Sequence, residues 1–168
     1  LDFYRCNRTL PPNENYDTWL PPDTYAKEHP EYFALVNGKR LQPKNSQGSK
    51  GWQPCVSNLD VQKIMAGNVI QYFRENPDVP GINVAINDGG GDCTCEECRA
   101  LDGPVTDYSR AIGISDRYVY FTNKICELVG EEFPDKFIVY LAYASASAAP
   151  QKVKPHPRLL PYTTTSSH

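Results

Sequence analysis

The chain has 168 residues, of which 40% are hydrophobic and 22% carry a charge, and its formal net charge at pH 7 is −3. This composition is typical of a globular domain and excludes a disordered chain, because the apolar surface is large enough to offset the entropy of ordering. The charge balance excludes the basic surface that nucleic-acid binding requires, and no apolar run of about 18 residues predicts a membrane span.

The proline-rich first third of the chain, residues 1–57, predicts an irregular segment that belongs to the same single domain as the rest. Its short elements are expected to be, in chain order, a helix over 23–29, an extended run over 32–36, a turn at Asn37-Gly38, a polar loop over 42–51 and a strand over 52–56. The helix should stop before Pro30, since the residue before a proline avoids the helical conformation.

Residues 58–168 alternate between helix and strand patterns. The predicted elements are a helix capped by Ser57-Asn58-Leu59-Asp60 that stops at Asn76, a strand over 81–87, a helix from Ser115 that ends before Pro134, a strand over 136–144 and a strand over 159–165. Because helices cross over between consecutive strands, we expect a parallel sheet, either open and doubly wound or part of an eight-unit barrel. In both folds, functional residues gather at the carboxyl ends of the strands.

The strand over 81–87 ends in an acidic turn, in which three glycines follow Asn87 and Asp88. A carboxylate at the end of a parallel strand can act as general acid, base or nucleophile, so Asp88 and Asn87 are the predicted catalytic residues. The glycines permit a positive φ angle and close backbone approach. Alternatively, Asp88 caps the loop through its own backbone. A phosphate-binding loop is disfavoured, because Thr94 stands where that fingerprint needs a glycine.

Six cysteines are present, and three of them, Cys93, Cys95 and Cys98, lie within six residues of sequence. Cys55 follows an extended run, is expected at the same edge of the sheet and would complete a four-thiolate structural zinc site. Structural disulfides are the competing interpretation, with Cys93 and Cys95 too close for an unstrained bridge. A redox pair formed by Cys95 and Cys98 is a third interpretation. Cys126 is expected to be a buried thiol on a helix.

Four further side chains are candidates for binding a substrate. They are His29, Arg40, Trp52 and Tyr143. Aromatic rings at a barrel mouth stack on sugar rings, although Tyr143 fits simple packing equally well. For His29, a hydrogen-bonded structural histidine is the favoured interpretation.

The chain begins at Leu1 and shows no signal peptide, which predicts a processed or excised piece of a longer protein. Asn7 opens an acceptor triplet for N-glycosylation. Together with the even number of cysteines, this triplet favours an exported protein, located outside the cell or at its surface.

Several motifs, in the same order, resemble the DUF4838 family. They are HPEYFAL at 29–35, NGKR at 37–40, CVSN at 55–58, NDGGG at 87–91, the cysteine run at 93–102 and LAY at 141–143. The resemblance extends from about Tyr25 to Thr165. It implies a carbohydrate-active TIM-type barrel, near the α-glucuronidase and hexosaminidase-like groups, in a large exported or cell-surface bacterial protein. The family has no settled mechanism.

The resemblance leads to one main functional hypothesis, a glycoside hydrolase-like barrel. Asp88 would supply acid or base chemistry, Asn87 would bind a sugar hydroxyl, and Tyr143 or Trp52 would stack on the ring. A complete barrel needs about 250 residues, so the chain would be a fragment and the second carboxylate would lie outside it. The alternatives are a non-catalytic glycan-binding or structural module held by its cysteines, and a fragment that assembles with other domains or copies through its sheet edges.

Overall fold

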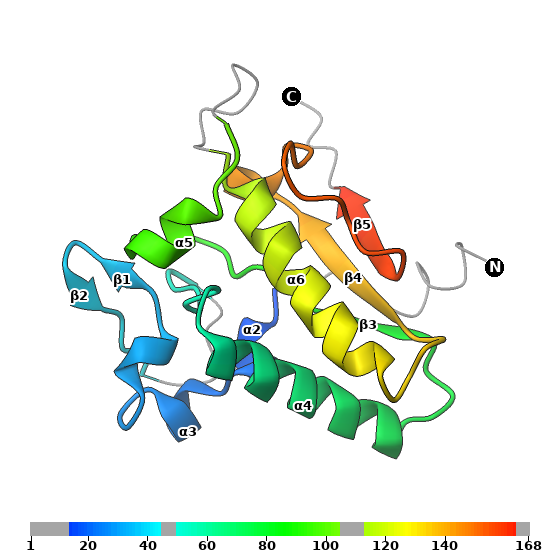
Figure 1. Ribbon diagram of the computed structural model, residues 1–168. Helices are drawn as coiled ribbons and strands as arrows, with labels where there is room; N and C mark the ends of the chain where they lie inside the picture. The colour runs from blue at the N-terminus through cyan, green and yellow to red at the C-terminus, as the bar shows by residue number, and fades with distance from the viewer. Residues whose placement is uncertain (1–13, 45–49, 105–112, 164–168) are drawn as a thin grey trace.

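The computed structural model describes residues 14–44, 50–104 and 113–163 and has a mixed α/β architecture. Its main sheet contains three parallel strands in the order β3-β4-β5 (Figure 1). These strands are β3 (Gly81–Asn83), β4 (Phe137–Ala142) and β5 (Leu159–Thr163). The predicted parallel α/β fold is thereby confirmed, whereas the described residues form no closed barrel, since β3 and β5 are edge strands.

Strand β4 lies at the centre of the sheet and bonds alternately to its two neighbours. The Ile138 N–H donates to the Arg158 carbonyl at 2.9 Å, and the Val139 carbonyl accepts from the Val84 N–H at 3.0 Å. Even-numbered residues of β4 therefore bond to β5 and odd-numbered ones to β3. On β5 the same alternation turns the backbone of Pro161, which is exposed, toward the outer edge of the sheet, where none of the described strands pairs with β5.

The N-terminal segment completes the other edge of the sheet, beside β3. The Asn15 side chain donates to the Asn83 carbonyl at 2.7 Å and accepts from the Ala85 N–H at 2.9 Å. The next helix, α2 (Tyr16–Trp19), anchors itself to the same carbonyl through the Trp19 indole N–H, at 2.9 Å. The ladder of β3 itself ends at Asn83, earlier than the predicted strand over 81–87.

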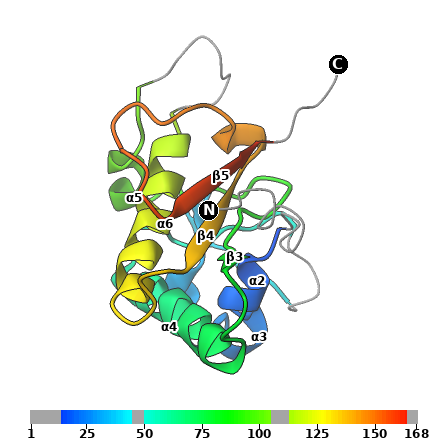
Figure 2. The same ribbon diagram turned by 90° about the vertical axis from the view of Figure 1, so that its right-hand side faces the viewer.

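Two long helices form the second layer of the fold (Figure 1). Helix α6 (Ser115–Gly130) packs on β4 and β5 and lies along one face of the sheet (Figure 2), while α4 (Leu59–Glu75) packs on α6 and α2. Both helices begin where the sequence predicts. The side chain of Asn58 caps α4 by accepting from the N–H groups of Asp60 and Val61, at 2.9 and 3.2 Å. Such a cap contributes about 1 kcal/mol.

Apolar side chains at helical spacing fill the space between these layers. The fully buried ones, each at most 1% exposed, include Val69 and Phe73 of α4, Tyr118, Phe121, Ile125 and Val129 of α6, and Ile138 of β4. Each side chain of this kind stabilises the fold by roughly 1.5–3 kcal/mol through burial. None of the helices in the described part of the chain has the length and apolar character that crossing a membrane requires.

The first third of the chain contains only short elements. They are α2, α3 (Pro22–Tyr25), η1 (Pro30–Tyr32), β1 (Leu35–Val36) and β2 (Lys39–Arg40). The predicted turn is confirmed, because β1 and β2 form a hairpin in which Asn37 and Gly38 have φ angles of 50° and 75°. The predicted helix over 23–29 is shorter and begins one residue earlier. The predicted strand over 52–56 is wrong, since it makes only a single bridge, at Pro54.

Four short helices were missed by the sequence patterns. Two of them, α2 and η1, lie in the first third of the chain. Helix α5 (Glu96–Ala100) lies between the strand predicted over 81–87 and the helix predicted from Ser115, and η2 (Ala144–Ala146) follows β4. All four are too short to show a helical periodicity. Cys6, the acceptor Asn7 and the last two residues of the strand predicted over 159–165 lie outside the described residues.

Candidate metal centre

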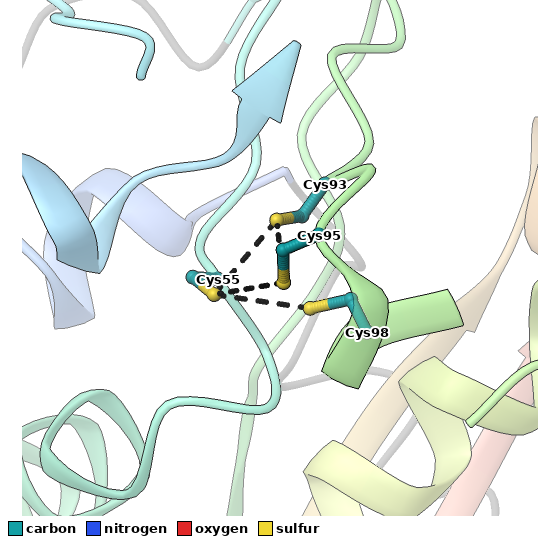
Figure 3. Close-up of side chains that lie close together, drawn as sticks. All are labelled: Cys55, Cys93, Cys95 and Cys98. Carbon is teal, nitrogen blue, oxygen red and sulfur yellow. Dashed lines mark hydrogen bonds between the residues drawn. The ribbon is translucent and has the colours of Figure 1, made fainter. Parts of the chain in front are cut away.

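Four cysteines from two distant segments of the chain come together beside α5 (Figure 3). Cys55, Cys93, Cys95 and Cys98 point toward one another, and their Sγ atoms all lie within 4.8 Å of each other. Cys55 Sγ is 3.8 Å from each of the other three sulfurs, and Cys93 Sγ is 3.4 Å from Cys95 Sγ. All four side chains are buried free thiols. The sequence prediction that Cys55 joins the other three is therefore confirmed.

The spacing of the sulfurs matches the ligand shell of a tetrahedral metal ion. With Zn–S bonds of about 2.3 Å, the edge of a sulfur tetrahedron is about 3.8 Å. A disulfide would instead need two sulfurs at about 2.05 Å. Four sulfur donors in this arrangement suit zinc or iron, and the cluster offers no oxygen or nitrogen ligand of the kind that magnesium or calcium prefers.

Backbone hydrogen bonds fix the two segments that carry the cysteines. The Cys55 N–H donates to the Tyr32 carbonyl at 2.8 Å, which holds the segment after Pro54 against η1. The N–H and hydroxyl of Thr94 both donate to the Leu35 carbonyl, at 2.8 and 2.7 Å, which holds the loop after β3 against the hairpin. Cys95 then serves as the N-cap residue of α5.

Polar groups around the cluster point at the sulfurs. The Leu35 N–H donates to Cys93 Sγ at 3.3 Å, and Arg40 Nη1 lies 3.8 Å from the same atom. Ser57 Oγ lies 3.1 Å from Cys98 Sγ. The sequence assigned Ser57 to the helix cap and Arg40 to substrate binding, whereas the structure places both at the sulfurs and gives the cap to Asn58. Donors of this kind orient metal-binding thiolates and lower their charge density.

The thiols influence one another's ionisation because they lie so close together. Hydrogen bonds with Cys93 and Cys98 lower the pKa of Cys55, whereas hydrogen bonds with Cys55 and Cys93, together with burial, raise the pKa of Cys98. Burial raises the pKa of Cys95 to about 11. A bound cation would favour the ionised form of all four groups, because metal ligands must be deprotonated. Burial also raises the pKa of Cys126, to about 12, in agreement with its predicted role as a buried thiol.

Arg117 of α6 braces the loop that carries the cysteines. Its guanidinium forms two hydrogen bonds with the Asp102 carboxylate, both at 2.7 Å, and a third with the Cys93 carbonyl at 2.6 Å. The side chains of Arg117 and Asp102 are only 4% and 11% exposed. Neither residue is among the site residues that the sequence predicts. The available signal was a charged residue, Arg117, directly beside Tyr118 on the buried side of a predicted helix.

Asn87, predicted to be catalytic, holds the backbone of the neighbouring segment. It is 3% exposed, its Nδ2 donates to the Trp52 carbonyl at 3.0 Å, and its Oδ1 accepts from the Tyr16 N–H at 3.1 Å. Its own N–H and carbonyl pair with the Gln53 side chain, at 3.1 and 2.7 Å. This amide therefore ties the end of β3 to the segments around residues 16 and 52.

Asp88, the other predicted catalytic residue, sits at the surface next to Asn87. Its carboxylate is 35% exposed and lies 3.7 Å from Lys50 Nζ, and its carbonyl accepts from the Gly51 N–H at 2.7 Å. The glycines at 89–91 all have φ angles between 78° and 82°, which confirms that they provide a positive φ angle. A Cβ on Gly91 would meet the Gly51 carbonyl oxygen at 2.7 Å, so the two loops approach as closely as glycine allows.

The predicted substrate-binding residues lie in different places. His29 stacks on Tyr32 with ring centroids 4.6 Å apart, and its Nδ1 lies 3.1 Å from Glu31 Oε1. Trp52 is 3% exposed and borders a pocket of about 300 Å³ that Lys50 also lines. Tyr143 packs against the apolar core. Trp52 is thus linked to Asp88 through Lys50, which lines the same pocket and lies beside the carboxylate.

A second carboxylate near the end of β3 was not predicted. Asp92 accepts a short hydrogen bond from the buried Tyr118 hydroxyl and lines a pocket of about 590 Å³ with Thr94, Arg99 and Arg117. Burial, and then the charge of Asp92, raise the pKa of Tyr118 well above its ordinary value. The signal available in the sequence was that Asp92 closes the same glycine-rich turn that Asp88 opens.

Comparison with known proteins matches the chain to one family model. A family model described as "Domain of unknown function (DUF4838)" matches residues 4–162, nearly the whole chain. The matched region contains all four clustered cysteines and the strand-end turn. No curated protein and no solved structure matches the chain.

Proposed function

We propose that this chain, which belongs to the DUF4838 family of domains of unknown function, is an α/β domain stabilised by one structural zinc ion. Cys55, Cys93, Cys95 and Cys98 are the ligands. The observation that carries the proposal is the distance of 3.8 Å from Cys55 Sγ to each of the other three sulfurs, which is the edge length of a Zn–S tetrahedron.

The environment of the cluster supports a structural and not a catalytic role. Structural zinc sites use four protein ligands, whereas catalytic ones keep a position open for water or substrate. Here four thiols supply the complete shell, and their side chains are at most 7% exposed. Both the closed shell and the burial disfavour a reaction at the metal.

The same geometry argues against disulfides in this cluster. To form one bridge, two sulfurs now 3.4 Å or more apart would have to approach to about 2.05 Å. The hydrogen bonds from Leu35 and Ser57 are those of separate thiols or thiolates. A metal ion satisfies all four sulfurs where they lie, without moving either segment.

A zinc ion at this point would join two parts of the fold. Cys55 belongs to the irregular segment before α4, and the other three cysteines belong to the connection between β3 and α6. Hydrogen bonds between Gln53 and Asn87 already tie these segments together ahead of the cysteines, and the metal would add a second connection at the cysteines themselves. Binding free energy of the metal therefore becomes folding free energy, as in other structural zinc sites.

Metal analysis of the purified protein tests this proposal. We expect one zinc ion per chain, and a Co²⁺-substituted form with the absorption of a tetrahedral thiolate complex. Absence of metal, combined with failure of a thiol reagent to label the four cysteines after denaturation, would show disulfides and overturn the proposal. Stoichiometric iron would overturn the choice of zinc.

A second function, hydrolysis of carbohydrate, is favoured by one observation at the strand end. The exposed part of Asp88 lies beside Lys50, which lines the same pocket as Trp52. We propose that Asp88 contributes acid or base chemistry to the cleavage of a glycosidic bond, and that the second carboxylate belongs to another part of an exported, barrel-type protein. Asn87 would then act by positioning this loop.

The substitution Asp88→Asn tests the second proposal. General acid or base catalysis is worth about 10²–10⁴-fold, so we expect turnover of the glycoside substrate to fall by at least about 100-fold, with the fold retained. The measurement is hydrolysis of a panel of glycosides by the full-length protein. Asp78→Asn, which neutralises an exposed carboxylate after α4, is the matched control. Equal turnover in the two variants would contradict the role of Asp88.

A further inference from the structure

Arg40 lies against the cysteine cluster through the geometry of the β1–β2 hairpin. The register of the hairpin places Arg40 directly opposite Leu35. The Leu35 N–H and the Arg40 guanidinium thus both reach Cys93 Sγ, at 3.3 and 3.8 Å. A second hydrogen bond, from Nη1 to the Phe33 carbonyl at 2.8 Å, fixes the guanidinium in this orientation.

The charge of the centre makes a cation at this position important. Four thiolates around Zn²⁺ carry a net charge of −2, in a site with little access to water. Arg117, a buried cation nearby, is already paired with Asp102 and bonds to a carbonyl and not to a sulfur. Arg40 is therefore the cation that compensates the sulfurs directly.

We propose that Arg40 is a positioning residue of the metal centre, which orients Cys93 Sγ and offsets the negative charge of the thiolates so that zinc is held tightly. This inference rests on the proposed zinc site. The turn at Asn37-Gly38 sets the register of the hairpin. In this register, the hairpin places two hydrogen-bond donors at the same ligand. Groups that bond to metal ligands in this way typically change metal affinity by about 10–100-fold when they are removed.

The experiment compares zinc affinity in four forms of the 168-residue chain. These forms are the unmodified chain, Arg40→Met, Arg40→Lys and, as a matched control, Arg99→Met. Arg99 follows the ligand Cys98 on α5, is exposed and, within the described residues, makes no contact with the sulfurs. The dissociation constant of zinc is measured by competition with a chelator of known affinity, and the Co²⁺ form supplies the energy of the sulfur-to-metal charge-transfer band.

We expect Arg40→Met to weaken zinc binding by about 10–100-fold and to shift the charge-transfer band. Arg40→Lys should recover most of the affinity, because it restores the positive charge, and Arg99→Met should match the unmodified chain. An affinity of Arg40→Met within about threefold of the unmodified chain, or an equal loss in Arg99→Met, would overturn the inference.

Arg40 also supports the fold through Phe33, so a purely structural effect must be separated from the effect on the metal. A structural role would lower the unfolding midpoints of the metal-free and zinc-bound forms together and leave the dissociation constant unchanged. If Arg40→Met does not fold, Arg40→Gln keeps a donor for the Phe33 carbonyl without the charge and answers the same question. If the unmodified chain binds no zinc, the zinc site itself is refuted, which is a different result from an unchanged affinity.

Discussion

The zinc affinity of a chain carrying Cys98→Ser is expected to fall by at least about 100-fold, and its thermal stability should no longer rise with added zinc. Structural zinc sites bind with about 10–16 kcal/mol, so each of four ligands accounts on average for roughly 3 kcal/mol. Cys98 is fully buried and lies between Cys55 Sγ, at 3.8 Å, and Ser57 Oγ, at 3.1 Å. A serine hydroxyl there is shorter and a poorer zinc ligand than a thiolate.

The measurement for this prediction is a pair of unfolding curves, with and without zinc, together with chelator competition. The matched control is Cys126→Ser, which makes the same chemical change at a buried thiol outside the cluster. Cys126→Ser should keep full zinc affinity, even though it places a hydroxyl in the core and lowers the stability of both forms. Retention of tight zinc binding by Cys98→Ser would contradict a four-cysteine centre.

The substitution Arg117→Met is expected to lower the free energy of unfolding by about 3–5 kcal/mol. It would leave the Asp102 carboxylate buried without its partner and remove the donor that the Cys93 carbonyl uses at 2.6 Å. Most of this loss of stability comes from the desolvated charge that remains, and not from the lost attraction between the two side chains. Urea unfolding of the zinc-bound form measures the change.

An exposed pair with the same geometry provides the control for Arg117. Arg74 binds Glu132 through the same two guanidinium nitrogens, at 2.7 and 2.6 Å, but these side chains are 55% and 40% exposed. Arg74→Met should therefore have a much smaller effect, since water replaces the lost contacts. In addition, Asp102→Leu should restore part of the stability of Arg117→Met, because it removes the unpaired charge. Equal losses in the two arginine variants would show that burial of the ion pair is unimportant.

The long elements were predictable because their patterns are periodic. Helices α4 and α6 and the apolar run of β4 each bury one continuous set of side chains, which fixes both their type and their place in the layers. The strand expected over 52–56 pairs with the chain only around the Phe33–Pro54 bridge, since the backbone of Leu35, which would continue the pairing, bonds to Cys93 and Thr94. Helix α5 has five residues, and a helix of that length depends on its surroundings and not on its own sequence.

The candidate site was predictable only as far as its ligands. A strand-end argument placed Cys55 near the other three cysteines. The structure brings the four together, although residues 52–56 form no strand. The contacts of Arg40 and Ser57 with the sulfurs depend on how a hairpin and a helix cap meet a loop some 40 or more residues away in sequence. No local sequence pattern shows that these segments come into contact. The role predicted for each residue therefore followed from the residues next to it in the sequence.

Pro161, on the open edge of the sheet, bears on the behaviour of the protein at high concentration. An edge strand with a complete row of outward N–H groups and carbonyls is a template for fibril growth between molecules. At Pro161 that row is interrupted, because a proline nitrogen carries no hydrogen and the backbone of this residue faces outward from β5. A strand from another molecule would leave its own carbonyl unsatisfied there, at a cost of about 1–3 kcal/mol when buried. Within the part of the chain that the structure describes, the outer edge of β5 therefore resists pairing with a strand of another molecule at Pro161.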